Sequence, residues 1–218
     1  KNSKYRIGSM SKTMTAELVF KAVDENLITL NQNIEEFFPK ITNAGKITIQ
    51  SLLNHSSGIP NFTEDPNYLE WNTKEFTREE IMRKFNSKKA VFEPSAQHIY
   101  SNSNYVLLSI ILEEVYNTTY AELFHNKLVE RLQLKNTYYE DSTEIEKNEV
   151  YSYVYRPDVE NTNVSNGWLK ENETHMSIPL GAGGIVSTPA DFASFLQALF
   201  AGKLISDTSL EKMLKVDN

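Results

Sequence analysis

A serine and a lysine stand three residues apart near the start of the chain, at Ser9 and Lys12. Residues at this spacing on a helix lie on one face, so the Lys12 amine can reach the Ser9 hydroxyl. A serine hydroxyl is a weak nucleophile until a neighbouring base takes its proton, and a lysine can do so only when its pKa is depressed. The pair predicts nucleophilic acyl transfer. Taken alone, it fits a helix-capping serine beside a surface lysine equally well.

The same spacing occurs a second time, at Ser209 and Lys212. There it has a structural explanation, because Thr208 and Glu211 form a capping box that puts Ser209 in the first turn of a solvated helix. We therefore expect Ser209 to take no part in chemistry.

Further segments distinguish the two copies. They read LLNHSSGIP at 52–60, YSN at 100–102 and GGIVSTPAD at 183–191, and Ile7-Gly8 precedes Ser9. In order and spacing these segments resemble the serine β-lactamase and penicillin-binding protein family across nearly the whole chain. The resemblance is greatest to the class C β-lactamases, the low-molecular-weight DD-peptidases and the related esterases.

The resemblance implies a role for each matching residue. Ser9 would attack a carbonyl carbon and form an acyl-enzyme, and Lys12 would accept its proton. Tyr100 would pass a proton to the leaving group and then help to activate the deacylating water; the alternative for it is a half-buried loop tyrosine. Asn102 would hydrogen-bond the amide side chain of the substrate and steady Lys12. His55 is expected to orient its neighbours rather than to react.

The family's third motif, K-[ST]-G or H-x-G on a strand beside the site, is not found, because no glycine has a lysine or histidine two positions before it. In relatives this motif follows a helix like 206–215, and sheet strands precede the segment at Ile7. We expect residues 1–218 to be a single partial catalytic domain without the N-terminal strands and the C-terminal strand that carries the motif. The expected fold is α+β, of the β-lactamase/DD-peptidase-like serine hydrolase kind, mainly its helical part with most strands of the antiparallel sheet missing.

The expected absence of strands has two consequences. The second N–H group of the oxyanion hole would be lost with the missing strand, which costs about 10²–10³ in rate. The apolar face of the first helix, including Leu18 and Val19, would lose its partner. We expect self-association or completion by further polypeptide to cover that face.

The elements that position these residues are mostly predicted to be helical. Helices are expected at 9–26, at 105–115, after the capping boxes Thr77 with Glu80 and Thr119 with Glu122, from Thr188-Pro189 to Gly202, and at 206–215. The best strand candidates are 149–155 and 184–187, and the Asn-rich stretch 158–174 is expected to be a loop or lid. Gly181, Gly183 and Gly184 are expected to let the backbone pass close beside the active site.

Composition excludes several classes of function. A net charge of -7 argues against a nucleic-acid partner. The chain has no cysteine, and its four histidines show no H-E-x-x-H spacing, so we expect no metal or cofactor. The longest apolar run, 106–112, is far shorter than the roughly 20 residues of a transmembrane helix. An exported, periplasmic or cell-envelope location is favoured by the family resemblance alone.

The leading hypothesis is a serine hydrolase that acts through an acyl-enzyme on a peptide-like or β-lactam amide or on an ester. Its partner would be a small-molecule or peptide-like substrate. The alternative is a non-catalytic binding or scaffold protein that has kept this fold. The missing third motif favours the alternative, whereas the intact Ser9, Lys12 and Tyr100 favour the enzyme.

Overall fold

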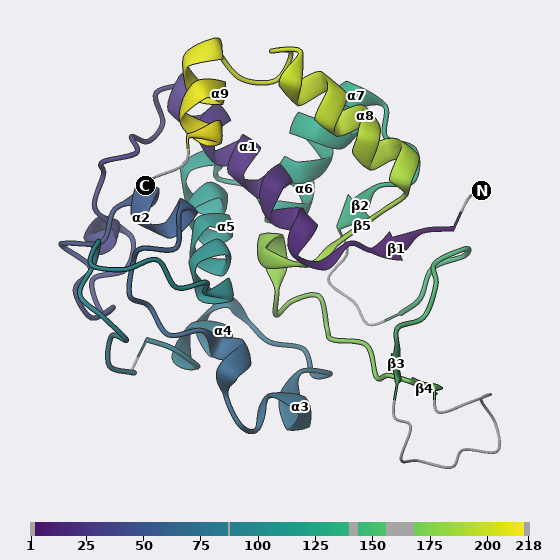
Figure 1. The fold of residues 1–218 in the computed structure, drawn as a ribbon, viewed down its shortest axis with the longest axis horizontal. Coiled ribbons are helices and arrows are strands. Elements are labelled where there is room, and N and C mark those ends of the chain that lie inside the picture. The colour runs from purple at the N-terminus through teal and green to yellow at the C-terminus, as the bar shows by residue number, and fades with distance from the viewer. Residues whose placement is uncertain (1–2, 87, 140–143, 156–167, 216–218) are drawn as a thin grey trace.

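The structure is a computed structural model, and it describes residues 3–86, 88–139, 144–155 and 168–215. Helices dominate these ranges (Figure 1). The α-helices are α1 Ser11–Asp24, α2 Ile49–Leu53, α3 Tyr68–Trp71, α4 Arg78–Arg83, α5 Asn102–Tyr116, α6 Tyr120–Phe124, α7 Glu130–Leu132, α8 Pro189–Phe200 and α9 Asp207–Leu214. The strands are β1 Tyr5–Arg6, β2 Tyr138–Tyr139, β3 Tyr153–Tyr155, β4 Trp168–Lys170 and β5 Ile185–Ser187.

A small antiparallel sheet brings a strand near the start of the chain beside two strands from its second half. Its order is β1-β5-β2, and Val186 of β5 pairs with Arg6 on one side and with Tyr138 on the other. All three residues of β5 are buried, as suits a central strand. The segment that leads into Ser9 is therefore fixed against residues 185–187, far away in the sequence.

The predicted strands are shorter in the structure than in the sequence analysis. Of 149–155 only Tyr153–Tyr155 forms a strand, and of 184–187 only Ile185–Ser187 does. The loop prediction for 158–174 is wrong at Trp168–Lys170, because these residues pair with β3 as β4. The residues 158–167 of that prediction lie outside the described residues.

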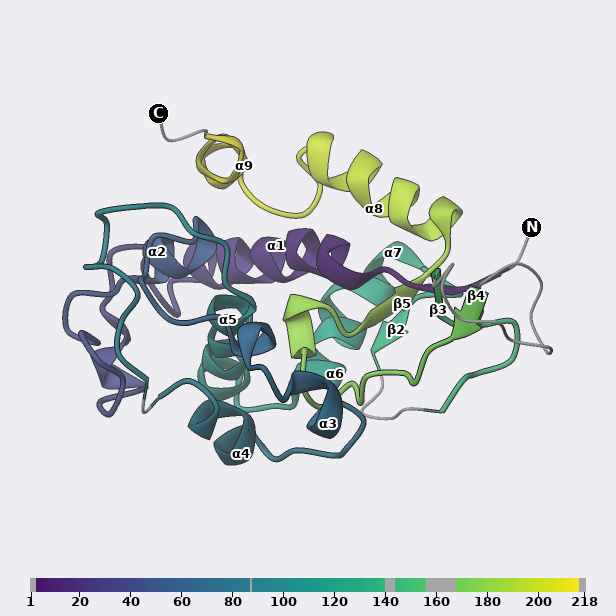
Figure 2. The same ribbon diagram turned by 60° about the horizontal axis from the view of Figure 1, so that its bottom comes forward.

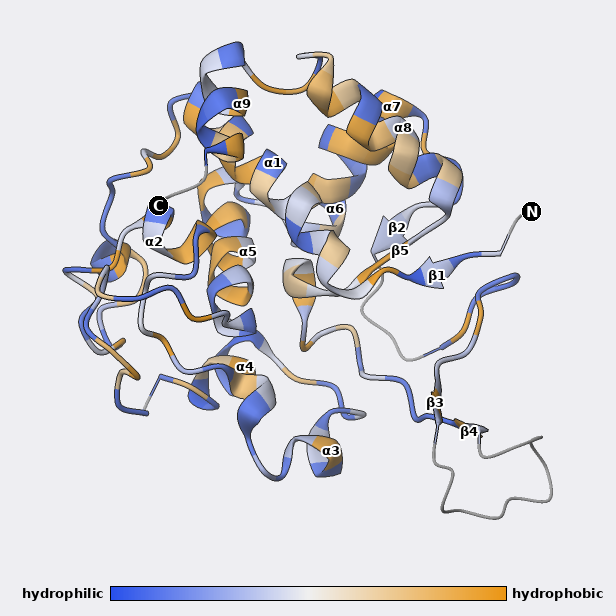
Figure 3. Ribbon diagram, in the orientation of Figure 1, coloured by the Kyte–Doolittle hydropathy of each residue, from blue (hydrophilic) through white to orange (hydrophobic). Residues whose placement is uncertain are grey.

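Helix α1 lies at the centre of the molecule (Figures 1 and 2), with α5 on one side and α9 on the other. Helix α5 is strongly apolar (Figure 3), and its residues 105–108, 111 and 112 are buried in the same core as Met14 of α1. Burial of the Met14, Leu18 and Val19 side chains stabilises the contact by about 1.5–3 kcal/mol for each side chain.

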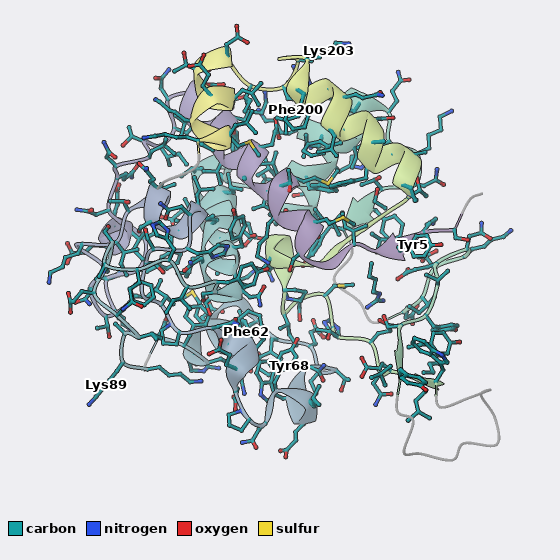
Figure 4. All side chains as sticks on the ribbon, in the orientation of Figure 1. Tyr5, Phe62, Tyr68, Lys89, Phe200 and Lys203 are labelled. Atoms are coloured by element: carbon teal, nitrogen blue, oxygen red, sulfur yellow. The ribbon has the colours of Figure 1, made fainter. Side chains whose placement is uncertain are left out.

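The prediction that Leu18 and Val19 would lack a partner is wrong. Both side chains are fully buried, because helices of this chain pack on more than one side of α1. A different face of α1, with Ala16, Phe20 and Val23, lines an open groove of about 940 Å³. Its other walls come from the segment 28–31, from residues 50–55 and from the C-terminal ends of α8 and α9. Phe200, labelled in Figure 4, is 58% exposed and belongs to the wall from α8.

Helix ends follow the sequence signals in most places. The capping boxes at Thr77 and Thr119 are confirmed, and Thr188 caps α8 with Pro189 in its first turn. The first helix differs from its prediction, because α1 begins at Ser11 and Ser9 lies in a preceding 3₁₀ turn, η1 (Gly8–Met10). Gly8 has φ +52° there, a left-handed conformation that glycine adopts without strain.

Glu17 of α1 is a fully buried carboxyl group in the core. Neither of its oxygens has a hydrogen-bond partner among the residues that the structure describes. Burial raises its pKa to about 8, and the nearby Lys21 and Arg131 oppose this rise only partly. Glu17 is therefore protonated in the folded chain at neutral pH.

Replacement of Glu17 by glutamine should flatten the pH dependence of stability. The wild-type carboxyl ionises near pH 4.5 when unfolded and near pH 8 when folded, so its ionisation penalises the folded state as the pH rises through this window. The free energy of unfolding should fall by up to about 1.4 kcal/mol per pH unit in the wild type and less in Glu17→Gln. Urea unfolding at several pH values measures this. Parallel curves, or an equal flattening in the control Glu114→Gln on the exposed side of α5, would show that Glu17 is not the source.

Candidate active site

Ser9 lies where the chain leaves β1 and enters α1, and its side chain is exposed. Strand β5 holds both sides of this turn. The Ile7 N–H donates to Ile185 O at 3.0 Å, and the Ile185 N–H donates to Ser11 Oγ at 3.2 Å. The nucleophile candidate therefore stands on a backbone that the sheet fixes.

Lys12 sits one turn further along and is 7% exposed. Its Nζ lies 3.3 Å from Ser9 Oγ, and it donates to Asn102 Oδ1 at 2.8 Å and to Ala182 O at 2.6 Å. Burial lowers the pKa of Lys12 to about 8. A lysine with this pKa is partly neutral near physiological pH and can act as a base.

Tyr100 approaches the same space from the segment that precedes α5. Its hydroxyl oxygen lies 2.6 Å from Ser9 Oγ, and Lys12 Nζ lies 4.8 Å from the centroid of its ring. The side chain is 45% exposed, so it covers the site from the solvent side. The structure thus brings Ser9, Lys12 and Tyr100 together, as the sequence analysis expected; their catalytic roles stay predictions.

The His55 ring packs against the Tyr100 ring and hydrogen-bonds to the backbone next to it. Its Nδ1 accepts from the Ser101 N–H and from Asn104 Nδ2, each at 3.3 Å, and its ring centroid is 4.5 Å from that of Tyr100. Burial, with a smaller effect of the Lys12 charge, lowers the pKa of His55 to about 4. A neutral histidine that accepts from two donors orients the loop around Tyr100, in agreement with the orienting role predicted for it.

Asn102 opens α5, and both ends of its side-chain amide bond to other residues of the chain; the contact with substrate expected for it stays a prediction. Its Oδ1 accepts from Lys12, and its Nδ2 donates to Asn61 Oδ1 at 3.3 Å and to Thr63 Oγ1 at 3.2 Å. The contact with Lys12 was expected from the family resemblance, whereas Asn61 and Thr63 were not expected to take part. The Pro60-Asn61 pair could have indicated Asn61. Pro and Asn favour turns, and an Asn side chain in a turn often hydrogen-bonds to nearby backbone.

The Ala182 carbonyl belongs to η6 (Leu180–Ala182), a 3₁₀ turn fixed by buried hydroxyl groups. Thr15 Oγ1 donates to Gly181 O at 2.8 Å, and the Gly181 N–H donates to Ser109 Oγ at 3.0 Å. Tyr120 OH lies 2.7 Å from Thr15 Oγ1, and this tyrosine is fully buried. The glycine-rich segment therefore passes beside the site as predicted, but the three hydroxyls that hold it were not foreseen.

The second serine–lysine pair is placed elsewhere. Ser209 is 3% exposed, and its Oγ donates to Asp24 Oδ1 at 2.6 Å. The capping prediction for Thr208 is wrong, because Ser206 caps α9 by accepting from the Ser209 N–H and also donates to Asp24. Ser209 thus fastens α9 to α1, so the helix is not solvated on that side.

Two other classes of site were sought in the described part of the chain. It contains no cluster of three or more His, Cys, Asp or Glu side chains arranged to hold a metal ion. No helix there is long and apolar enough to span a membrane.

Comparison with known proteins decides the family. A family model described as Beta-lactamase matches residues 1–216. The chain belongs to the Beta-lactamase family. The family and the α+β, β-lactamase-like fold expected from the sequence are confirmed, whereas the absence of terminal strands stays a prediction.

Relatives of this Beta-lactamase family member are hydrolases. A teichoic acid D-alanine hydrolase of Staphylococcus aureus (strain MRSA252) is 27% identical over 94% of this chain and 48% of its own length. A D-stereospecific amidohydrolase from Streptomyces sp. has a TM-score of 0.87 at 26% identity, over 99% of this chain and 66% of that one. A D-amino acid amidase from Ochrobactrum anthropi SV3, complexed with L-phenylalanine amide, has a TM-score of 0.86 at 26% identity, over 96% and 59%. The chain thus spans about half the length of its curated relative.

Replacement of Gly181 by alanine should displace the turn whose Ala182 carbonyl accepts from Lys12. The new Cβ would lie 2.6 Å from both Ser109 Oγ and Tyr120 OH, and closer still to Thr15 Oγ1, so the turn that carries the Ala182 carbonyl must shift. We expect a loss of about 1–3 kcal/mol of stability and slower labelling of Ser9 by a fluorophosphonate. Thermal melting and intact-mass kinetics measure both effects.

The control for this variant is Gly45→Ala. Its Cβ would meet only the flexible Glu35 side chain, at 3.1 Å, so it should have little effect on either measurement. Labelling of Gly181→Ala at the wild-type rate would show that the turn does not position Lys12.

Proposed function

We propose that this chain carries the acyl-transfer centre of a serine hydrolase, with Ser9 as nucleophile, Lys12 as base and Tyr100 as second proton carrier. The proposal rests on the close approach of the Lys12 amine and the Tyr100 hydroxyl to the Ser9 hydroxyl. Ser9 Oγ lies 3.3 Å from Lys12 Nζ and 2.6 Å from Tyr100 OH. These distances suit proton transfer to and from the nucleophile.

The surroundings of Lys12 favour its action as a base. A neutral amine has two N–H bonds and one lone pair. Asn102 Oδ1 and Ala182 O can only accept, so they engage the two N–H bonds and leave the lone pair for the Ser9 hydroxyl. The lowered pKa of about 8 makes this neutral form accessible.

The proposed reaction has two balanced halves. Ser9 Oγ bonds to the substrate carbonyl carbon as its proton passes to Lys12, and the leaving group departs with a proton delivered through Tyr100. Water then attacks the acyl-enzyme, gives one proton to this base system and releases Ser9 with its hydroxyl restored. The N-terminal end of α1 adds a partial positive charge that stabilises the developing oxyanion.

The activities named for the relatives support one substrate class. The curated relative acts on D-alanine carried by teichoic acid, and the solved neighbours are a D-amino acid amidase and a D-stereospecific amidohydrolase. We therefore favour a D-aminoacyl ester or amide over a β-lactam among the substrates that the sequence left open. A teichoic acid substrate would place the protein at the cell envelope.

Covalent labelling separates the enzyme from the non-catalytic alternative. Incubation with a fluorophosphonate should add one reagent mass to the wild-type chain, none to Ser9→Ala and almost none to Lys12→Ala, because the exposed Ser9 hydroxyl lies beside the Lys12 amine. Ser209→Ala is the matched control and should label like the wild type, since the Ser209 hydroxyl is bonded to Asp24. An unlabelled wild type would support the scaffold alternative, and labelling lost only in Ser209→Ala would mean that the wrong serine was chosen.

The pH dependence of labelling should report Lys12. The base is competent only when neutral, so the rate should rise about tenfold per pH unit at acidic pH and level off above about pH 8. Stopped-time mass spectrometry with an uncharged fluorophosphonate measures this profile. A midpoint below pH 7 would point to a base other than Lys12.

A further inference from the structure

We propose that Asn61 and Thr63 are positioning residues that hold the side-chain oxygen of Asn102 toward Lys12. They act through Asn102, and within the described part of the chain neither of them hydrogen-bonds to Ser9 or Tyr100. The inference deepens the proposed function, because its importance for catalysis rests on Lys12 being the base.

The orientation of the Asn61 amide is fixed by the backbone. Asn61 Oδ1 accepts from the Asn102 N–H at 3.1 Å and from the Thr63 N–H at 3.4 Å. Main-chain N–H groups can only donate, so the atom that faces them must be the amide oxygen and not the amide nitrogen. This makes Asn61 a fixed acceptor that also caps the turn η3 (Phe62–Glu64).

A fixed acceptor at Asn61 determines how Asn102 is turned. Asn102 Nδ2 donates to Asn61 Oδ1 at 3.3 Å and to Thr63 Oγ1 at 3.2 Å, which uses both of its hydrogens. The opposite orientation would place two amide oxygens against each other. The oxygen of Asn102 must therefore face Lys12 Nζ, at 2.8 Å.

The orientation matters because the two ends of an amide act on Lys12 in opposite ways. An oxygen accepts a Lys12 N–H and leaves the lone pair for Ser9, whereas an NH₂ group would donate to that lone pair and compete with the Ser9 hydroxyl. The titratable groups recorded around Lys12 in the described residues are Tyr100 and Tyr105, whose rings lie 4.8 and 5.5 Å from Nζ, and His55. Within these residues Lys12 has no carboxylate partner that could fix its state instead.

Asn61→Ala tests the inference directly. Without the acceptor, Asn102 can turn its NH₂ group toward Lys12, which destabilises the ammonium form. The midpoint of the Lys12 titration, followed by NMR of chains with ¹³C-labelled lysine, should move about one pH unit lower. The plateau of fluorophosphonate labelling at high pH should fall about threefold to tenfold.

A matched control removes the effect of a lost cap. Thr77→Ala also deletes an uncharged side-chain cap, on α4, and should leave both readouts unchanged. A Lys12 titration in Asn61→Ala that matches the wild type, or an equal shift in Thr77→Ala, would overturn the inference. The NMR titration does not require acylation of Ser9. A wild-type chain that is not labelled would therefore reject the proposed function, whereas the Lys12 titration would still test this inference.

Thr63 provides a second variant should Asn61→Ala fail to fold, as judged by circular dichroism. Thr63→Val removes one of the two acceptors on Asn102 Nδ2 with almost no change of shape, so the Lys12 midpoint should move the same way by a smaller amount. Thr63→Ser keeps the hydroxyl and should restore the wild-type titration. Identical titrations in Thr63→Val and the wild type would count against the inference.

Discussion

A buried amine without a counter-ion is the constraint on which the site depends. Lys12 is 7% exposed, and the described residues offer it two carbonyl oxygens, from Asn102 and Ala182, but no carboxylate. A carboxylate would hold the lysine charged and raise its pKa, whereas neutral acceptors stabilise the ammonium form less and let burial lower the pKa to about 8. The two acceptors come from α5 and η6, so the packing of both elements against α1 places them around the Lys12 amine, the proposed base.

Burial acts on a second ionisable group of α1 with the opposite result. Glu17 is fully buried and has no recorded hydrogen-bond partner within the described residues, and its pKa is raised to about 8. In both cases desolvation favours the neutral form, but only Lys12 has acceptors that fix its geometry. The central helix therefore carries a lysine whose pKa is lowered to about 8 and a glutamic acid that destabilises the folded chain when it ionises.

The sequence predicted the site side chains better than their supports. The spacing of Ser9 and Lys12 indicated acyl-transfer chemistry only weakly by itself. The resemblance to the family singled out this pair, together with Tyr100 and Asn102. The Ala182 carbonyl could not be found in this way, since every residue has a backbone oxygen. Thr208 was expected to cap the last helix, but Ser206 is its N-cap. Several nearby Ser and Thr residues can serve as a cap, and helix boundaries expected from sequence shift by one or two positions. Leu18 and Val19 were expected to lack cover because the family resemblance packs this helix against strands that the chain was expected to lack. Both are buried, and periodicity, which shows that a face is apolar, does not show which element covers it.

The site is fixed on its protein side and adjustable on its solvent side. The backbone N–H groups of Thr63 and Asn102 can only donate, so they fix the amide oxygen of Asn61 toward them. That oxygen in turn fixes the amide of Asn102, whose own oxygen then faces Lys12. On the other side, Ser9 and the 45% exposed Tyr100 are joined through hydroxyl groups, and either one can donate. The proposed proton relay would need this asymmetry, because the lone pair of Lys12 would have to point at one place while the hydroxyl hydrogens of Ser9 and Tyr100 reorient between successive steps.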